Sequence, residues 1–175
     1  MIRKIVLKIL RLVMSPISYA KYIGVKWGNG GRCSRRVEFG SEPYLIKIGD
    51  NCTITSGVNF VTHDGSACLA KDEKGRRYYY APIVVGNNVF IGINSIIMPG
   101  VCIDDNVIIG AGSIVTKSIP SGYIVAGNPA KIIGTTASYI YIRRCLETYV
   151  SESDFISKDK KIIECISSFK DYMKL

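Results

Sequence analysis

Hydrophobic positions in the middle of the chain recur every six residues. The stretch 85–120 divides into six consecutive hexads, VGNNVF, IGINSI, IMPGVC, IDDNVI, IGAGSI and VTKSIP. Every first position is Val or Ile, and every fifth position is Val, Ser or Ile. An earlier stretch, 48–65, repeats the pattern as IGDNCT, ITSGVN and FVTHDG. An amphipathic helix has a hydrophobic period of about 3.6 and a half-buried strand a period of about 2, so neither element explains this pattern.

A period of six is typical of a parallel β-helix with a triangular cross-section. Each hexad forms one short strand and one corner, and the first-position aliphatic points inward and stacks on its counterpart one coil away. Gly and Asn suit the corners because they adopt backbone conformations that are costly for other residues. Since three hexads complete a coil, the stretch 85–120 predicts two coils, and a weaker phase begins upstream at Val25 and Val37. The main body is therefore predicted to be all-β.

The two hexad runs do not share a frame, which places an insertion between them. Residues 66–82, SACLAKDEKGRRYYYAP, are first polar and charged and then rich in tyrosine. We expect this segment to leave the coil as an excursion, and loops of such length in a compact domain are usually functional or disordered. After Pro120 the repeat ends in the turn-rich segment SGYIVAGNPAKIIG.

Both ends of the chain are predicted to be helical. We expect an N-terminal amphipathic helix over 1–23, the coil domain over 24–134 and a C-terminal helical extension over 135–175. One apolar stripe of this extension is formed by Ile162, Ile163, Ile166, Phe169 and Met173. Such a stripe is expected to pack against the body or a partner.

The excess positive charge is confined to the N-terminal segment. Residues 1–36 carry nine Lys and Arg and no acidic residue, and the rest of the chain is balanced, so the net charge of +9 arises there. A nucleic-acid-binding body would carry a basic face through the fold, which argues against that class. On a helix, Lys4, Lys8 and Arg11 share one narrow strip opposite a broad apolar face. The longest uncharged stretch, residues 12–20, is too short to span a bilayer.

Three interpretations of this helix stay open. It packs on the body or on a sister subunit, or it makes peripheral contact with a membrane, with its basic strip toward anionic headgroups. The third interpretation is an arm that binds nucleic acid.

Six cysteines and one histidine limit the metal and redox chemistry. No two cysteines form a CxxC pair, so we expect no metal site, and a chain of this length needs no disulfides. We interpret the cysteines as reduced, mostly buried residues of a cytoplasmic protein. His63 lies where the first hexad run ends, and its position alone fits either a structural residue or a catalyst. No Walker motif, GxSxG or dinucleotide fingerprint occurs in the sequence.

The stretch from about residue 22 to 134 resembles the hexapeptide-repeat acetyltransferases. The resemblance is carried by GSEPYLIKIGDNCTITSGVNFVTHDG and by NNVFIGINSIIMPGVCIDDNVIIGAGSIVTKSIPSGYIVAGNPAKII, in which GAGSIVTKSIP and AGNPAK are the more specific segments. That family includes galactoside, maltose, serine and xenobiotic acetyltransferases and the O-acetyltransferases of capsule and O-antigen synthesis. The resemblance implies a left-handed β-helix, an exception to the right-handed crossover rule, and a homotrimer.

The resemblance also assigns roles to individual residues. His63 matches the family's general base, which would deprotonate an acceptor hydroxyl as it attacks the thioester of acetyl-CoA. No cysteine is then needed as a nucleophile. Three carboxylates, Glu38, Glu42 and Asp64, or a backbone carbonyl are candidates to orient the imidazole. The residues implied for acetyl-CoA are Ile93, Ala111 and Thr116 along the pantetheine arm, with Lys117 and Lys131 at the phosphates.

The acceptor is expected to meet the excursion. The candidate substrate residues are Asp64, Arg76, Arg77 and Tyr78, which offer charge, a hydroxyl and an aromatic face; a subunit-packing role for the loop is an equal alternative. We expect acetyl transfer to a sugar hydroxyl in surface polysaccharide synthesis, in the cytoplasm or at the inner face of the membrane. The rivals are a xenobiotic or amino-sugar acetyltransferase and a non-catalytic β-helix scaffold.

Overall fold

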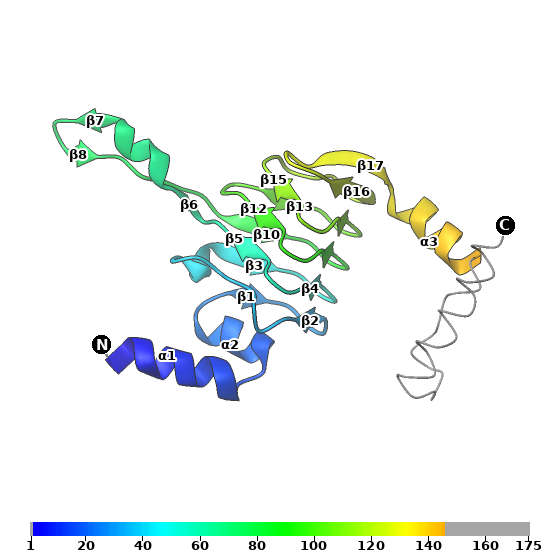
Figure 1. The fold of residues 1–175 in the computed structure, drawn as a ribbon, viewed down its shortest axis with the longest axis horizontal. Helices are drawn as coiled ribbons and strands as arrows, with labels where there is room; N and C mark the ends of the chain where they lie inside the picture. Colours follow the sequence, from blue (N-terminus) through cyan, green and yellow to red (C-terminus); the bar gives the residue numbers. More distant parts are fainter. Residues whose placement is uncertain (1, 146–175) are drawn as a thin grey trace. The chain divides into compact units, whose positions relative to one another are not determined.

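The computed structural model describes residues 2–145, and its body is a coil of short strands (Figure 1). Three parallel sheets run along the coil. The first sheet contains β1 (Lys26–Trp27), β3 (Ile46–Ile48), β10 (Ile83–Val85) and β13 (Cys102–Ile103). The second contains β2 (Arg32–Cys33), β4 (Thr53–Ile54), β11 (Phe90–Ile91), β14 (Ile108–Ile109), β16 (Tyr123–Ala126) and β17 (Lys131–Thr135). The third contains β5 (Asn59–Phe60), β12 (Ile96–Ile97) and β15 (Ile114–Val115).

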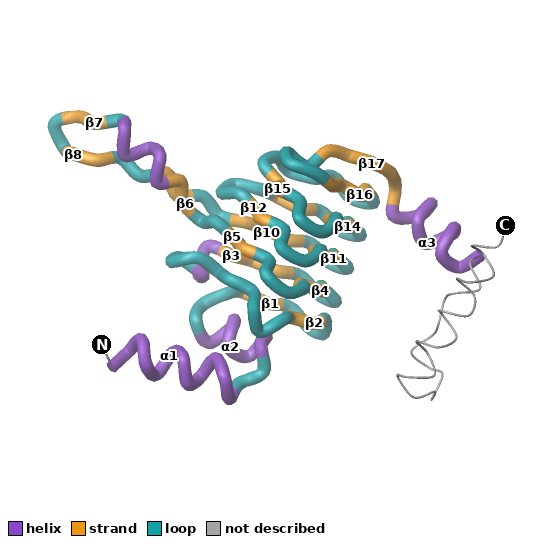
Figure 2. The backbone as a smooth tube through the Cα atoms, in the orientation of Figure 1, coloured by secondary structure: helices purple, strands orange, loops and turns teal. Residues whose placement is uncertain are grey.

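Consecutive strands visit the three sheets in turn, so the chain winds as a three-sided parallel coil, seen as stacked turns in Figure 2. Within the regular part, residues paired between neighbouring coils are 18 apart in number, as in Phe90 with Ile108. This is three hexads, and the all-β body of hexad strands is confirmed. The antiparallel strand β17 pairs with β16 and ends the second sheet.

Two insertions increase the sequence separation between paired residues of neighbouring coils, but the strands still pair. The short helix η1 (Pro43–Leu45) lies between the first two coils, where paired residues such as Trp27 and Ile48 are 21 apart. The excursion lies between the next two coils, where Ile54 pairs with Ile91 at a separation of 37. The hexad frame is therefore interrupted twice, although the sheets are continuous.

The hexad rule describes the core of the coil. All first and fifth positions of the run 85–120 are buried. The two fifth-position serines are satisfied inside the core, because the hydroxyls of Ser95 and Ser113 both donate to the carbonyl of Gly110, at 3.0 and 2.6 Å. In the earlier run the fifth position of the last hexad, Asp64, is exposed, since the chain leaves the coil there.

The corners use the left-handed backbone conformation. Asn51, Asn88, Asn94 and Asn106 have φ between 54° and 59°, a region that Asn enters more easily than other side chains. Gly92 permits close stacking of coils, because a Cβ there would lie 2.5 Å from the backbone nitrogen of Ala111.

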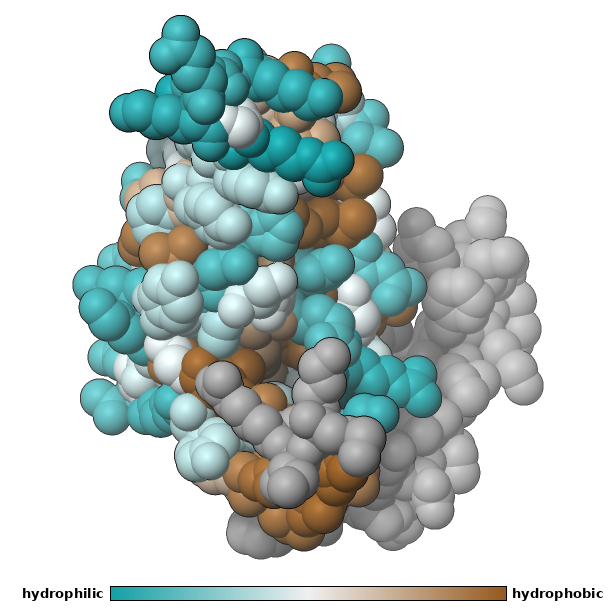
Figure 3. All heavy atoms as spheres, turned by 90° about the vertical axis from the view of Figure 1, so that its left-hand side faces the viewer, coloured by the Kyte–Doolittle hydropathy of each residue, from teal (hydrophilic) through white to brown (hydrophobic). Residues whose placement is uncertain are grey.

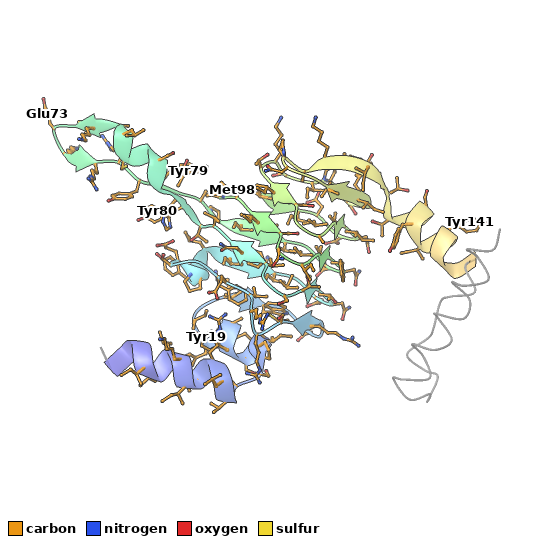
Figure 4. The ribbon with its side chains drawn as sticks, viewed as in Figure 1. Tyr19, Glu73, Tyr79, Tyr80, Met98 and Tyr141 are labelled. Carbon is orange, nitrogen blue, oxygen red and sulfur yellow. The ribbon has the colours of Figure 1, made fainter. Side chains whose placement is uncertain are left out.

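The excursion is an extended arm with secondary structure of its own. It contains β6 (His63–Asp64), η2 (Gly65–Leu69), β7 (Lys71–Asp72), β8 (Gly75–Arg76) and β9 (Tyr79–Tyr80). Strands β7 and β8 pair as a hairpin, and β6 pairs antiparallel with β9 at the base. Figures 1 and 4 show the arm projecting from the coil, with Glu73 at its tip.

The N-terminal segment forms two helices, so the prediction of a single helix over 1–23 was wrong. Helix α1 (Ile2–Val13) is followed by α2 (Pro16–Tyr22). The break occurs at Ser15, whose side chain accepts a hydrogen bond from the backbone nitrogen of Ser18 and caps α2, with Pro16 at the first helical position.

Two arginines fasten α1 to the base of the coil. The guanidinium of Arg11 donates to the carbonyls of Arg35 and Val37 and forms an ion pair with Glu38 at 2.8 Å. The guanidinium of Arg35 donates in return to the carbonyls of Arg11, Leu12 and Met14 at the end of α1. Arg11, one of the three residues of the basic strip, is therefore engaged by the body.

This attachment leaves the apolar face of α1 in solvent. Its exposed side chains are Ile5, Val6, Ile9, Leu12 and Val13, at 43 to 74% exposure. The brown surface at the foot of Figure 3 lies at this end of the molecule. No helix among residues 2–145 is long and apolar enough to cross a bilayer.

The chain divides into two compact units, residues 1–136 and 137–175. Helix α3 (Thr136–Cys145) begins at their boundary. The predicted apolar stripe of Ile162, Ile163, Ile166, Phe169 and Met173 lies outside the described residues.

Candidate active site

Five of the predicted site residues lie on the two edges of the third sheet, where its strands begin or end. His63 follows β5, and Thr116 and Lys117 follow β15. Because the strands of this sheet are parallel, the residues after them share one edge. Ile93 and Ala111 precede β12 and β15, so they lie at the opposite edge. Within one chain the structure therefore separates these two groups.

His63 is held where the excursion begins. It pairs with Tyr80 across β6 and β9, and the two rings have centroids 5.6 Å apart. Figure 4 shows Tyr80 at this base of the arm. The Nδ1 atom of His63 lies 3.0 Å from Oε2 of Glu42. The imidazole is 36% exposed and the Glu42 side chain only 14%, so the ring faces solvent and the carboxylate lies behind it.

The preceding coil delivers Glu42 to this position. The backbone nitrogen of Phe60 donates to the carbonyl of Glu38, which aligns the segment before Glu42 with β5. Gly40, at a φ of 63°, then turns the chain close to the side chain of Thr62. Glu42 and His63 thus stack at one corner although they are 21 residues apart.

The other two candidate carboxylates are engaged elsewhere. Asp64 accepts a hydrogen bond from the backbone nitrogen of Ser66 at 2.8 Å and caps η2, and Glu38 pairs with Arg11. Among the three carboxylates considered from the sequence, Glu42 is the one that orients His63.

The charge on Glu42 fixes the tautomer of the ring. The hydrogen bond from the Thr62 hydroxyl lowers the pKa of Glu42, and the contact with His63 lowers it further. An ionised carboxylate only accepts hydrogen bonds, so Nδ1 of the neutral imidazole carries the proton. Nε2 then holds the free lone pair, which is the arrangement of a general base.

Three of the described thiols are poor nucleophiles. Burial raises the pKa of Cys33 to about 12 and also raises that of Cys52 and Cys102, so these groups are protonated at neutral pH. The expectation that most cysteines are buried was wrong for the side chains described, since only Cys52 is buried and Cys102 is exposed. Residues 2–145 contain no cluster of three His, Cys, Asp or Glu that could hold a metal ion.

The excursion presents charge and aromatic rings to solvent. Arg76 and Tyr78 are exposed, and the rings of Tyr78 and Tyr80 lie 6.3 Å apart. Arg77 forms an ion pair with Asp72 inside the arm, so its charge is partly compensated. Lys131, on β17, is also exposed. No sequence signal identified Tyr80 as the ring neighbour of His63, since their pairing depends on how the arm folds back.

A groove opens beside the turn that carries Glu42. It has a volume of about 640 Å³ and lies between the N-terminal helices and that turn. Its lining residues are Val6, Leu7, Tyr19, Tyr22, Ile23, Gly40, Ser41 and Pro43. The groove thus lies between α1 and residues that flank Glu42 in sequence, and neither Glu42 nor His63 lines it.

Known proteins share both the repeat and the architecture. Residues 82–117 match the family described as bacterial transferase hexapeptide (six repeats). Protein CapG of Staphylococcus aureus is 43% identical over 175 residues, covering 97% of each chain. The galactoside O-acetyltransferase of Escherichia coli (strain K12) is 44% identical over 92 residues, which are 53% of this chain and 45% of that protein.

Two solved structures extend the likeness. A galactoside acetyltransferase in complex with coenzyme A is 26% identical, with a TM-score of 0.62 over 89% of this chain and 88% of that one. A maltose O-acetyltransferase from Clostridium difficile 630 is 25% identical, with a TM-score of 0.56 over 75% of this chain and 83% of that one.

Hexad strands wound into three parallel sheets, with a solvent-facing imidazole at one corner, define a hexapeptide-repeat transferase. The chain belongs to the bacterial transferase hexapeptide family, as its match to that family and its full-length likeness to CapG show, and the predicted family is confirmed.

Proposed function

We propose that the protein transfers the acetyl group of acetyl-CoA to a hydroxyl of a sugar, in the synthesis of a surface polysaccharide such as capsule or O-antigen. The observation that carries this proposal is the Glu42–His63 pair, in which Nδ1 of a partly exposed imidazole lies 3.0 Å from a largely buried carboxylate. Galactoside and maltose O-acetyltransferases among the relatives support a sugar acceptor.

The reaction needs one base that takes and returns a proton. Nε2 of His63 removes the proton of the acceptor hydroxyl as its oxygen attacks the thioester carbonyl carbon. Glu42 accepts from Nδ1–H and stabilises the imidazolium that forms. The tetrahedral intermediate then collapses, the carbon–sulfur bond breaks, and the imidazolium returns the proton to the leaving thiolate. Atoms and charge balance without an acetyl-enzyme, in keeping with the protonated thiols.

The acetyl-CoA site is assigned by the resemblance and fits the surface of the coil. Ile93 and Ala111 are exposed at one edge of the third sheet, where a pantetheine arm can lie against the backbone. Thr116 lies at the other edge. The exposed ammonium groups of Lys117 and Lys131 would bind phosphates as point charges.

We also propose that the coil is left-handed and that three copies assemble. The site residues occupy both edges of the third sheet, so a neighbouring subunit would complete each site. Outward side chains of two sheets are apolar and suit such packing: Phe90, Ile108 and Ile124 on the second, Ile96 and Ile114 on the third.

Mass measurement in solution should give a trimer, and a stable, active monomer would refute a shared site.

Release of thiol from acetyl-CoA tests the activity itself. A panel of hydroxyl sugars, amino sugars and hydroxylated antibiotics should show turnover with the sugar hydroxyls. Turnover with amines or antibiotics alone would favour the amino-sugar or xenobiotic alternative. Absence of turnover with every acceptor, in a correctly assembled protein, would favour the scaffold.

We assign acceptor recognition to the excursion. Asp64, Arg76, Arg77 and Tyr78 are exposed on or at the base of the arm and could bind a glycan through charge, hydroxyl and ring contacts. The alternative is that the arm packs on a neighbouring subunit.

The N-terminal helices are proposed to bring the enzyme to the inner face of the cytoplasmic membrane. The Arg11–Arg35 contacts hold the apolar side of α1 outward, while residues 1–36 carry only positive charge. An exposed apolar face within a basic segment complements an anionic bilayer surface.

Replacing two side chains of this face should release the protein from membranes. The double variant Ile9→Ser, Leu12→Ser removes apolar groups that are 54 and 74% exposed, so we expect at least about tenfold weaker partitioning onto phosphatidylglycerol-rich vesicles in co-sedimentation. Ile133→Ser, at an exposed apolar site on β17, is the matched control and should bind as wild type. Unchanged vesicle binding of the double variant would refute the membrane role of α1 and favour the interpretation that the helix packs on protein.

A further inference from the structure

We infer that Thr62 is a positioning residue of the active site, which locks the Glu42 carboxylate in the orientation that His63 requires. The inference rests on the proposed function of His63 as a base. Its carrying observation is that Thr62 and His63 both contact the same carboxylate oxygen, Oε2 of Glu42.

Both contacts to this oxygen are within hydrogen-bond distance. The Thr62 hydroxyl donates to Oε2 at 2.6 Å, and Nδ1 of His63 lies 3.0 Å from it. The Thr62 residue is 1% exposed, so water does not compete for its hydroxyl. A buried hydrogen bond to a charged group is stronger than one between neutral groups, and it fixes direction as well as distance.

The backbone under this pair leaves space for the hydroxyl. A Cβ at Gly40 would lie 3.0 Å from Oγ1 of Thr62 and 2.9 Å from the carbonyl of Phe60. A glycine at this turn therefore lets Glu42 approach Thr62 from the preceding coil. Burial alternates along this stretch of the chain. Thr62 is buried and contacts the carboxylate, whereas the next residue, His63, is partly exposed to solvent.

The strength of the orienting bond depends on Glu42 being ionised. The hydrogen bond from Thr62 is the largest cause that lowers the pKa of Glu42. Removing the hydroxyl should raise that pKa, so Glu42 would become protonated at a higher pH. Because Glu42 contacts His63, its titration is coupled to that of the base, so loss of the hydroxyl should change the pH dependence of the rate, an effect that a purely structural role would not produce.

Thr62→Val tests the inference, because valine keeps the shape and removes the hydroxyl. We expect kcat to fall about tenfold with the KM for acetyl-CoA unchanged, and the pH dependence of kcat to change. Thr62→Ser, which retains a hydroxyl, should restore most of kcat. In a Glu42→Gln background the same valine change should have less than about a twofold effect, since the two residues act as one unit. Thr136→Val is the matched control, because the Thr136 hydroxyl is likewise buried and donates to the carbonyl of Asn106 at 2.7 Å.

The histidine ring provides a readout that does not depend on turnover. His63 is the only histidine, so the ¹⁵N signals of its ring are unambiguous. The wild type should populate the Nδ1–H tautomer, and Thr62→Val should lower that population. A wild type without transferase activity would refute the proposed function, and this ring measurement would still decide the role of Thr62.

Two results would overturn the inference. One is a folded Thr62→Val protein with wild-type kcat, pH profile and tautomer population. The other applies even if that variant does not fold: rapid solvent exchange of the Thr62 hydroxyl proton in the unmodified protein would show that the bond to Glu42 is not held.

Discussion

Replacing His63 with alanine is expected to lower kcat by at least about 10²-fold, while the KM for acetyl-CoA stays within about twofold. The imidazole is the base in the proposed reaction, and its partner Glu42, at 3.0 Å, orients the ring. Steady-state thiol release with a sugar acceptor measures both constants. Because His63 is partly open to solvent, added imidazole should restore part of the rate.

A second histidine variant separates loss of the base from loss of packing. His63→Gln retains polarity and volume but supplies no base, so it should be as inactive as the alanine variant and should not disturb folding. Activity of either variant within about threefold of wild type would refute the assignment of His63 as the general base.

Replacing Phe60 with alanine is expected to lower the free energy of unfolding by about 3–5 kcal/mol. Phe60 is fully buried, and its ring stacks on that of Phe39 with centroids 5.7 Å apart and an angle of 7° between planes. Trp27 packs edge-on against Phe39, so the cavity would open beside a continuous aromatic cluster of the lower coils. Equilibrium denaturation in urea measures the loss.

Phe60→Leu is the control for this cavity. Leucine keeps most of the apolar volume, so it should cost less than about 1.5 kcal/mol. Equal losses for the alanine and leucine variants would show that the aromatic stacking, and not the volume, sets the stability of this layer.

The hexad period was sufficient to predict the core of the coil. In the run 85–120 the first and fifth positions all point inward, because each strand is short and the corners between strands keep one phase. The rule fails at Asp64, where the excursion begins, since a residue outside the coil has no inward direction. Periodicity therefore locates the buried positions only as far as the winding continues.

The partner of the imidazole could not be selected from the sequence. Glu42 and His63 are 21 residues apart, which is not a multiple of six, because η1 adds residues between the first two coils. Asp64 is adjacent in sequence, but its side chain turns to the nitrogen of Ser66. Contacts that depend on an insertion of unknown path become visible only when the coils are stacked.

The N-terminal segment shows a different limit. The break before Pro16 follows from local capping chemistry, which the sequence contains. The contacts of Arg11 with Arg35 and Glu38 could not be predicted in this way, because a helical pattern predicts only which residues share one side of the helix. Which side faces the body depends on partners far along the chain.

Helix α2 covers the first coil and therefore affects whether molecules can associate end to end. Ala20 is fully buried, Ile17 and Ile23 pack against the core, and Val25 donates its backbone N–H to the carbonyl of Ala20. A bare first coil would offer unpaired strand edges to the last coil of another molecule, a template for open-ended fibres. The helix ends the stack with a surface that cannot extend a sheet. We therefore expect a shortened protein lacking this helix to polymerise even in the absence of lipid.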